Sequence, residues 1–195
     1  EPTPKEALAL INGVSMSAAL AAVAVVRARR VLDNAIAAAA MTMEAARAAS
    51  GCIDPRPQDV RGHTGGMLVA AELRELLKGS QRVHPDRLPD AFSLRCAPGV
   101  LGAVSDALDH IEGIVDRELN GVSDNPLLFD GEWLEAGNFH GASIAMAMDH
   151  LRIAIAQLAT ISERRTYRLT HGDLSPNLPS FLVAGTGLNS GFMLA

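Results

Sequence analysis

The longest element that the hydrophobic pattern predicts is a helix from Ser15 to Ser50. This stretch contains no proline or glycine, and Ala, Leu, Val and Met alternate with only a few charged residues. Such a helix would be about 50 Å long at the standard rise per residue. Because it is apolar nearly all round, other helices should cover most of its sides. We therefore expect subunit association; a long helix in a large monomeric bundle is the alternative.

Three later stretches also place apolar residues three or four positions apart, as the buried face of a helix requires. Glycines follow the first two of them, at Gly79 and Gly121, and glycine is a natural helix stop. The expected helices span residues 67–78, 98–120 and 142–169. Together with the first helix, they predict an all-α architecture.

The connecting segments carry turn signals. Residues 51–66 are rich in Pro, Asp and Gly and are expected to form a loop. Asp130-Gly131 lies between apolar residues within 126–134, which predicts a short β-hairpin. A last helix is expected to begin near Leu188.

Composition agrees with packed helices and argues against several functions. The chain is 48% hydrophobic but only 4% aromatic, which favours close-packed helices over β-sandwiches. A net charge of -5 with dispersed cations argues against binding to nucleic acid. The longest uninterrupted apolar run, Ala18 to Val26, is too short to cross a membrane. Cys52 and Cys96 form no CxxC pair, so we expect a reducing cytoplasm and neither disulfide nor zinc.

Generic catalytic motifs do not occur in the chain. It lacks a Gly-x-Ser-x-Gly elbow, a phosphate loop, a His-Glu-x-x-His helix and a dinucleotide-binding turn. His140 and His150 lie ten residues apart with no partner ligand nearby, so no metal site is expected. The charged run 163–165, Glu-Arg-Arg, is interpreted as a salt-bridged helix face.

Three positions together suggest a pocket of amino-acid size. Asn12 lies at a break between two helical segments, where an uncharged amide can project into a cavity. Arg95 is a lone cation before a helix, and its planar fork suits a carboxylate. Phe139 lies between Gly137 and Gly141 at a helix start. Each position alone also fits a purely structural role.

Six short segments resemble those of the aromatic amino-acid ammonia-lyases, and the histidine ammonia-lyase branch most of all. In the family's order and at close to its spacing, they are residues 8–13, 93–96, 123–126, 137–140, 161–165 and 187–193. The resemblance implies a long-helix bundle of the ammonia-lyase (fumarase/aspartase-like) type. It also implies a homotetramer whose active sites draw residues from three subunits. Residues 1–195 are then expected to be a central fragment, lacking the N-terminal electrophile-bearing part and the C-terminal part.

The resemblance further implies a reaction. A histidine-like amino acid loses ammonia to give an α,β-unsaturated acid, by means of a methylidene-imidazolone electrophile made from Ala-Ser-Gly and without a metal. Ala49-Ser50-Gly51 has this composition, but the family's electrophile precedes the Ile-Asn-Gly motif. The electrophile is therefore expected upstream of Glu1. We interpret Ala49-Ser50-Gly51 as a helix end capped by Gly51.

The resemblance also implies roles for individual residues, each by its position in a matching segment. Asn12 matches the asparagine near the electrophile and the substrate amine, and Arg95 the arginine that pairs with the substrate carboxylate. Phe139 matches an aromatic of the pocket wall, and Met193 would face the substrate ring. Phe92 stands where the family has a catalytic tyrosine, and its side chain cannot ionise or donate a proton.

Two further departures leave other functions open. Pro89 stands in place of a usual glutamine, and Val14 in place of a threonine. A 2,3-aminomutase of the same family is one alternative. The other is a non-catalytic, oligomerising or amino-acid-binding pseudoenzyme. For the isolated chain we predict self-association and no lyase activity.

Overall fold

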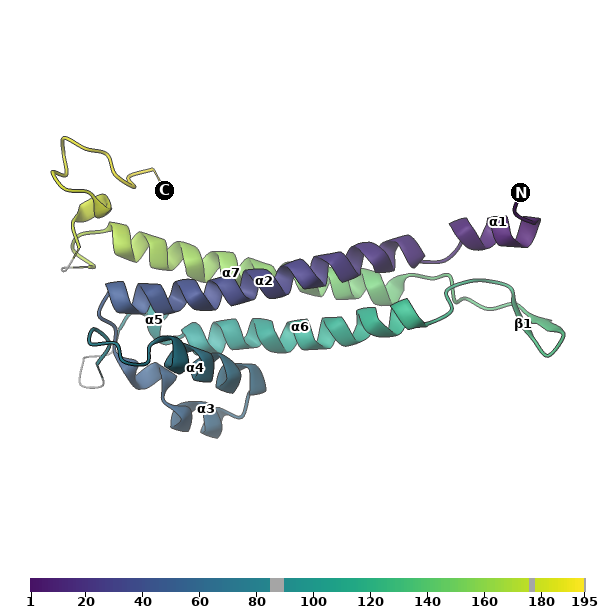
Figure 1. The fold of residues 1–195 in the computed structure, drawn as a ribbon, viewed down its shortest axis with the longest axis horizontal. Helices are drawn as coiled ribbons and strands as arrows, with labels where there is room; N and C mark the ends of the chain where they lie inside the picture. Colours follow the sequence, from purple (N-terminus) through teal and green to yellow (C-terminus); the bar gives the residue numbers. More distant parts are fainter. Residues whose placement is uncertain (85–89, 176–177, 195) are drawn as a thin grey trace. The chain divides into compact units, whose positions relative to one another are not determined.

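The computed structural model describes residues 1–84, 90–175 and 178–194, so Pro89 lies outside the described residues. Its regular elements are helices and one short hairpin (Figure 1). In chain order these are α1 (Pro4–Ile11), α2 (Ser15–Ala45), η1 (Ser50–Ile53), α3 (Pro55–Arg61), α4 (Thr64–Leu76), α5 (Phe92–Arg95), α6 (Ala97–Asn120), β1 (Leu127–Phe129), β2 (Glu132–Leu134), α7 (Ala142–Thr170) and η2 (Ser180–Leu182).

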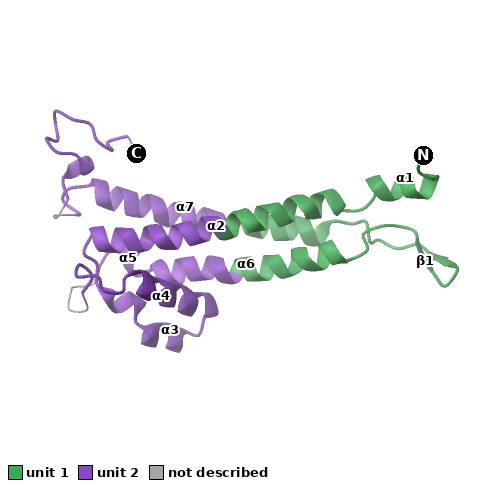
Figure 2. Cartoon of the chain, viewed as in Figure 1, with its two compact units in different colours: residues 1–29, 107–153 green, residues 30–106, 154–195 purple. Residues whose placement is uncertain are grey.

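The chain divides into two compact units (Figure 2). Unit 1 comprises residues 1–29 and 107–153, and unit 2 comprises residues 30–106 and 154–195. Each of the long helices α2, α6 and α7 contributes residues to both units.

The interior of unit 1 is built from one apolar stripe on each long helix. The stripe residues recur every three or four positions, so one face of each helix is buried. They are Ala18, Ala21, Val25 and Ala28 of α2, Leu108, Ile111 and Val115 of α6, and Ile144, Ala147 and Leu151 of α7. Small alanines on α2 allow close packing of its neighbours.

In unit 2, glycines allow α4 and α6 to cross closely. A Cβ atom on Gly102 would stand 2.3 Å from the Gly66 nitrogen, and one on Gly65 would stand 2.1 Å from the Gly102 oxygen. The Gly65 N–H also donates a 2.7 Å hydrogen bond to Asp106 Oδ1. Both helices also carry fully buried side chains, Leu73 on α4 and Leu101 on α6, each 0% exposed.

The structure confirms the predicted long helices and the predicted hairpin, but α2 ends earlier than predicted. The helix stops at Ala45, and Arg47 takes a left-handed conformation with φ 52°. Gly51 is therefore not a helix cap; it lies inside η1. The Ala-rich sequence carries no breaker before residue 51, so its pattern could not reveal this earlier stop.

The loop predicted over 51–66 is also wrong, because η1, α3 and the start of α4 lie there. The Asp54 side chain accepts a 2.9 Å hydrogen bond from the Arg56 N–H, and Pro55 begins α3. Gly62 ends α3 with φ 76°. The same Asp, Pro and Gly that indicated a loop are here the signals that start and stop a short helix.

The helix predicted near Leu188 is absent: the described residues 188–194 form turns and a bridge instead. Gly185, Gly187 and Gly191 all have positive φ, which is incompatible with a right-handed helix. Leu188 is 94% exposed, so this apolar residue finds no cover in the chain.

Two helical stretches, Pro4–Ala45 and Ala142–Thr170, are long and apolar enough to cross a membrane by length and composition. The longest uninterrupted apolar run, Ala18 to Val26, had indicated the opposite, because single polar residues interrupt these helices. Core helices of water-soluble proteins pass the same test, so the finding is weak evidence for a membrane.

Candidate active site

Phe92 and Arg95 lie together on the short helix α5. Leu94 between them is buried, with 1% exposure, and anchors the turn, whereas Phe92 and Arg95 both remain exposed. The Arg95 guanidinium carbon lies 4.7 Å from the centre of the Phe92 ring. This cation–π contact is worth about 0.5–1 kcal/mol at an exposed site. Phe92, which has no proton to donate, therefore acts here as a platform for Arg95.

Two cavities of unit 2 flank this pair. Phe92 lines one of about 390 Å³ together with Tyr167 and Arg168 of α7. Arg95 lines another of about 530 Å³, where Arg61 supplies a second cation. Three residues line both cavities: Cys96, Val100 and Gln157. These volumes are in the range that binds small molecules, and the cations favour a carboxylate.

Met193 lies in a third cavity of unit 2. This cavity measures about 450 Å³ and lies between α7 and the C-terminal segment. Phe192, Tyr167 and His171 line it with Met193, and the Tyr167 and His171 rings are 5.6 Å apart. Within unit 2, Tyr167 is shared with the cavity beside Phe92. The structure thus brings Phe92 and Arg95 into contact and puts Met193 in a neighbouring aromatic cavity.

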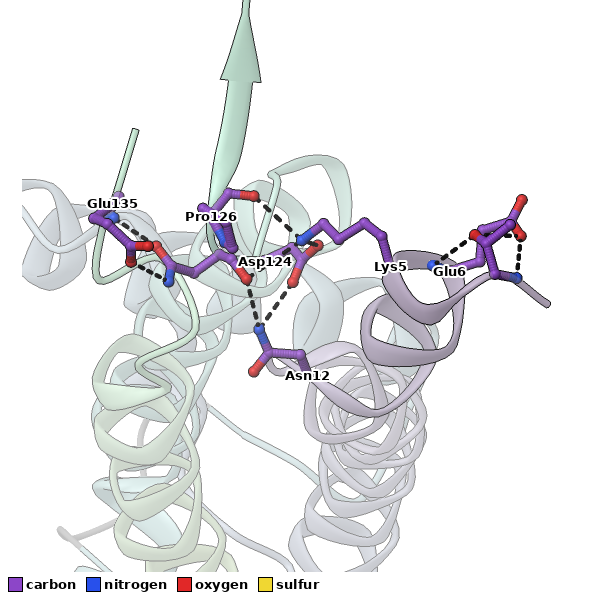
Figure 3. Close-up of polar contacts among 9 residues, drawn as sticks. Lys5, Glu6, Asn12, Asp124, Pro126 and Glu135 are labelled. Carbon is purple, nitrogen blue, oxygen red and sulfur yellow. Dashed lines mark hydrogen bonds and ion pairs between the residues drawn. The ribbon is translucent and has the colours of Figure 1, made fainter. Parts of the chain in front are cut away.

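Asn12 belongs to unit 1 and lies at the predicted break between helices. It follows α1, and its backbone N–H donates to the Leu8 oxygen at 2.8 Å. Its side-chain Nδ2 donates to Asp124 Oδ1 at 2.8 Å and to the Asn125 oxygen at 3.3 Å. Figure 3 shows the Asn12 and Lys5 side chains converging on Asp124.

The segment around Phe139 lies beside the one that carries Asn12. A Cβ atom on Gly141 would stand 2.9 Å from Val14 Cγ1, so the two segments are in direct contact. Val14 is buried at this contact, and Phe139 is 47% exposed. Of the two glycines that frame Phe139, Gly141 allows this close approach to the Asn12 segment, whereas nothing lies within 4 Å of a Cβ atom on Gly137.

The most strongly perturbed acid near these residues is Asp124. Hydrogen bonds from Lys5 and then from Asn12 lower the pKa of the Asp124 carboxyl to about 2. The Lys5 ammonium lies 2.8 Å from Asp124 Oδ2 and also bonds the Asn125 and Pro126 oxygens. The segment 123–126 belongs to the sequence resemblance, but the resemblance assigned no role to Asp124 or Lys5. Lys5 and Asp124 lie 119 positions apart in the sequence, so their pairing could not be predicted from local spacing.

The charged run 163–165 is only partly as predicted. Glu163 and Arg164 form the expected exposed ion pair. Arg165 is instead buried at 3% exposure, and its Nη1 has no hydrogen-bond partner among the described residues. Burial lowers the pKa of the Arg165 guanidinium. The Glu-Arg-Arg sequence of residues 163–165 does not by itself reveal which of the two arginines turns inward.

The Ala49-Ser50-Gly51 tripeptide is tied into a structural turn. The Ala49 N–H donates to Asp90 Oδ2, and the Ser50 N–H donates to the His84 oxygen at 3.1 Å. Nearby, burial is the main cause that raises the pKa of the Cys52 thiol to about 11. A thiol with such a pKa is protonated at neutral pH and is a poor nucleophile.

Among residues 1–84, 90–175 and 178–194, no group of three or more His, Cys, Asp or Glu side chains lies together in a way that could hold a metal ion. His150 lies near a second histidine, His110, with ring centres 6.1 Å apart.

Comparison with known proteins gives these residues a context. A family model described as aromatic amino acid lyase matches residues 1–195. The histidine ammonia-lyase of Caldanaerobacter subterraneus is 45% identical over 196 residues, which cover 98% of this chain and 38% of that protein. The histidine ammonia-lyase of Deinococcus radiodurans is 46% identical over 199 residues, with 98% and 38% covered. The chain therefore spans about two fifths of the length of these relatives.

Solved structures agree with the sequence matches. The crystal structure of histidine ammonia-lyase from Trypanosoma cruzi superposes with a TM-score of 0.89 at 47% identity, covering 97% of this chain and 36% of that one. Tyrosine aminomutase from Streptomyces globisporus superposes with a TM-score of 0.94 at 37% identity, covering 99% and 41%. These matches confirm the predicted helical ammonia-lyase fold. By sequence and by structure, the chain belongs to the aromatic amino acid lyase family.

Proposed function

We propose that the complete protein carrying this chain is an ammonia-lyase that acts on histidine and releases ammonia and the α,β-unsaturated acid. The observation that carries the proposal is the 45% identity, over 98% of the chain, to a protein named histidine ammonia-lyase. The contacts within each unit support it: unit 2 holds the Arg95 cation, which suits a carboxylate, and unit 1 holds the uncharged Asn12 amide, which suits an amine.

The carboxylate of the substrate is assigned to Arg95. The guanidinium fork can donate two parallel hydrogen bonds to a carboxylate, and the Phe92 ring holds it by the cation–π contact. Arg95 is not paired with an acid by any ion pair among the described residues, which leaves its fork for a ligand. Met193 of unit 2 and Phe139 of unit 1 are each assigned to an apolar wall by their positions in the sequence.

The amine end of the substrate is assigned to Asn12. The residues present also fit a neutral heterocyclic electrophile, because an uncharged amide and the aromatic Phe139 lie on segments in contact with one another. Methylidene-imidazolone, when present, supplies an electrophile for the substrate amine. By the family's order of motifs, it is expected from an Ala-Ser-Gly other than Ala49-Ser50-Gly51, and the latter is held by hydrogen bonds in a structural turn.

Phe92 limits what this chain can do in catalysis. A benzyl side chain accepts and donates no proton, so the β-proton of the substrate must be removed by another group of the complete protein. In this proposal Phe92 supports carboxylate binding through Arg95. It has no role in acid–base chemistry.

Assembly as a homotetramer is part of the proposal. Several large apolar side chains of α2 remain exposed in the single chain, among them Met16 at 73%, Leu20 at 60% and Met41 at 73%. Exposed apolar side chains of this number favour burial against further subunits. A small amino acid as substrate, a cytoplasmic location, and the absence of metal, membrane and nucleic-acid partners complete the proposal.

Product analysis tests the function. The complete protein is incubated with histidine, phenylalanine or tyrosine, and ammonia and organic products are quantified. The proposal expects ammonia and an unsaturated acid in equal amounts, with histidine the preferred substrate. A β-amino acid without net release of ammonia would identify an aminomutase instead. No conversion of any of the three would identify a pseudoenzyme.

A further inference from the structure

The Asn12 side chain has a fixed orientation in unit 1. Its Nδ2 faces two oxygens, Asp124 Oδ1 at 2.8 Å and the Asn125 carbonyl at 3.3 Å. Both protons of an amide nitrogen are thereby used. In Figure 3 the Asn12 oxygen points to the opposite side from Asp124, and no described residue donates a hydrogen bond to it.

The charge of Asp124 explains why the amide cannot turn round. An ionised carboxylate accepts hydrogen bonds and donates none, and so does a backbone carbonyl. Turning the Asn12 amide would place its oxygen against two other oxygens, which is repulsive. The Lys5 ammonium, 2.8 Å from Asp124 Oδ2, keeps the carboxylate in its ionised form.

The backbone around this contact is tightly packed. Gly13 has φ 78°, and a Cβ atom there would stand 1.9 Å from the Ser123 oxygen. The Val14 N–H donates to Ser123 Oγ at 3.3 Å. Two segments more than a hundred residues apart in sequence therefore meet without room for a side chain, and the distance between Asn12 and Asp124 is fixed.

The turn that carries Asp124 is held from its other side as well. Asn125 Nδ2 donates to Glu135 Oε2 at 2.9 Å, and Asn125 Oδ1 accepts from the Ala136 N–H. Among the described residues, the Asn12 amide donates to Asp124 and Asn125 and not to Glu135, so Glu135 stabilises the turn through Asn125. It provides a matched control for Asp124.

We propose that Asp124, clamped by Lys5, is a positioning residue that fixes the Asn12 amide with its carbonyl oxygen facing outward. Asn12 then presents an acceptor only, which suits the N–H groups of a substrate amine and does not suit a carboxylate. The inference rests on the proposed function for the identity of the ligand. The orientation of Asn12 itself stands on the contacts of unit 1.

A double-mutant cycle in the complete protein tests whether Asp124 acts through Asn12. With histidine as substrate, Asp124→Ala is expected to lower kcat roughly 100-fold, the scale of a misplaced reacting group. In an Asn12→Ala background, Asp124→Ala should change kcat by less than about twofold, because the residue it positions is gone. The KM for histidine should change little when Asp124→Ala is made in either background, since Arg95 is unaltered. Glu135→Gln should stay within about twofold of wild type. Effects of Asp124→Ala that add to those of Asn12→Ala would overturn the proposal.

A second measurement is independent of catalysis. In the 195-residue chain labelled with ¹⁵N-asparagine, the side-chain amide of Asn12 is identified by its loss in Asn12→Ala. Asp124→Ala should speed solvent exchange of that amide by at least about tenfold, and Glu135→Gln should leave it unchanged. An unchanged exchange rate in Asp124→Ala would overturn the positioning role. Should Asp124→Ala fail to fold, Asp124→Asn keeps the side-chain size, and its uncharged amide should still loosen Asn12.

The two measurements separate the two claims. A complete protein that converts no amino acid defeats the proposed function, while amide exchange still decides the role of Asp124. Normal turnover with additive mutations defeats the positioning role alone.

Discussion

Gly102→Ala is expected to destabilise the fold strongly, because the α4–α6 crossing leaves no room for a methyl group. The added Cβ would stand 2.3 Å from the Gly66 nitrogen, 2.5 Å from its Cα and 2.6 Å from the Gly65 carbonyl carbon. All three atoms are backbone, so no side chain can swing aside. Restoring ordinary contact requires α4 to move by about 1 Å in a close-packed interior.

The magnitude follows from two opposing effects. Overpacking of this kind costs about 3 kcal/mol, the upper part of the usual range, because the obstacle is backbone. Replacing glycine by alanine within a helix returns about 1 kcal/mol. The net loss of about 2 kcal/mol should lower the Tm by about 4–8 °C for a chain of this size.

Thermal unfolding followed by circular dichroism measures the effect, at one protein concentration because association shifts Tm. Gly99→Ala is the matched control on the same helix: nothing lies within 4 Å of its added Cβ. It should raise the free energy of unfolding by about 0.5–1 kcal/mol. A Gly102→Ala variant that unfolds at or above the wild-type temperature would refute the close crossing of α4 and α6.

Three further outcomes are expected. Phe92→Tyr should raise the kcat of the complete protein by about tenfold or more, because a phenol can transfer a proton; steady-state kinetics with histidine decides, and an unchanged kcat counts against a catalytic position. Asp124 has a folded-state pKa near 2, below its ordinary value of about 3.9, so its contribution to stability is present above about pH 4 and lost as the pH falls toward 2. Asp124→Asn should lower Tm at pH 7 and flatten its decline at acid pH, and an unaltered decline contradicts this. The isolated 195-residue chain should self-associate and show no lyase activity; a monomer in sedimentation or measurable unsaturated acid would contradict the respective expectation.

The sequence predicted the elements whose boundaries are marked by strong local signals. Helix α6 begins at Ala97, beside Pro98, and ends at Asn120, before Gly121, and the hairpin turns at Asp130-Gly131 with positive φ at both residues. In these places, local conformational preference and burial favour the same structure. The short helix α3 was missed because Asp54-Pro55 serves equally in a turn and at a helix start.

Site residues were predictable one at a time, while their environments were not. Asn12 and Phe139 lie where the pattern placed them, at a helix break and before a helix start, and Arg95 precedes α6 as predicted but lies on a short helix of its own, α5. The contact between Asn12 and Asp124 joins positions 112 residues apart, and only folding brings them together. The role of Phe92 as a platform for Arg95 likewise depends on a ring-to-guanidinium distance that sequence does not contain.

The proposed function assigns to this chain the carboxylate-binding part of a histidine ammonia-lyase, and this is the central claim. The most direct test measures ammonia released from histidine by the complete protein and by its Arg95→Lys variant across a range of histidine concentrations. The claim predicts ammonia release by the wild type. It also predicts a KM about tenfold higher in Arg95→Lys, because a point charge replaces the paired donors of the guanidinium. Absence of ammonia release by the wild type, or an unchanged KM in Arg95→Lys, would contradict it.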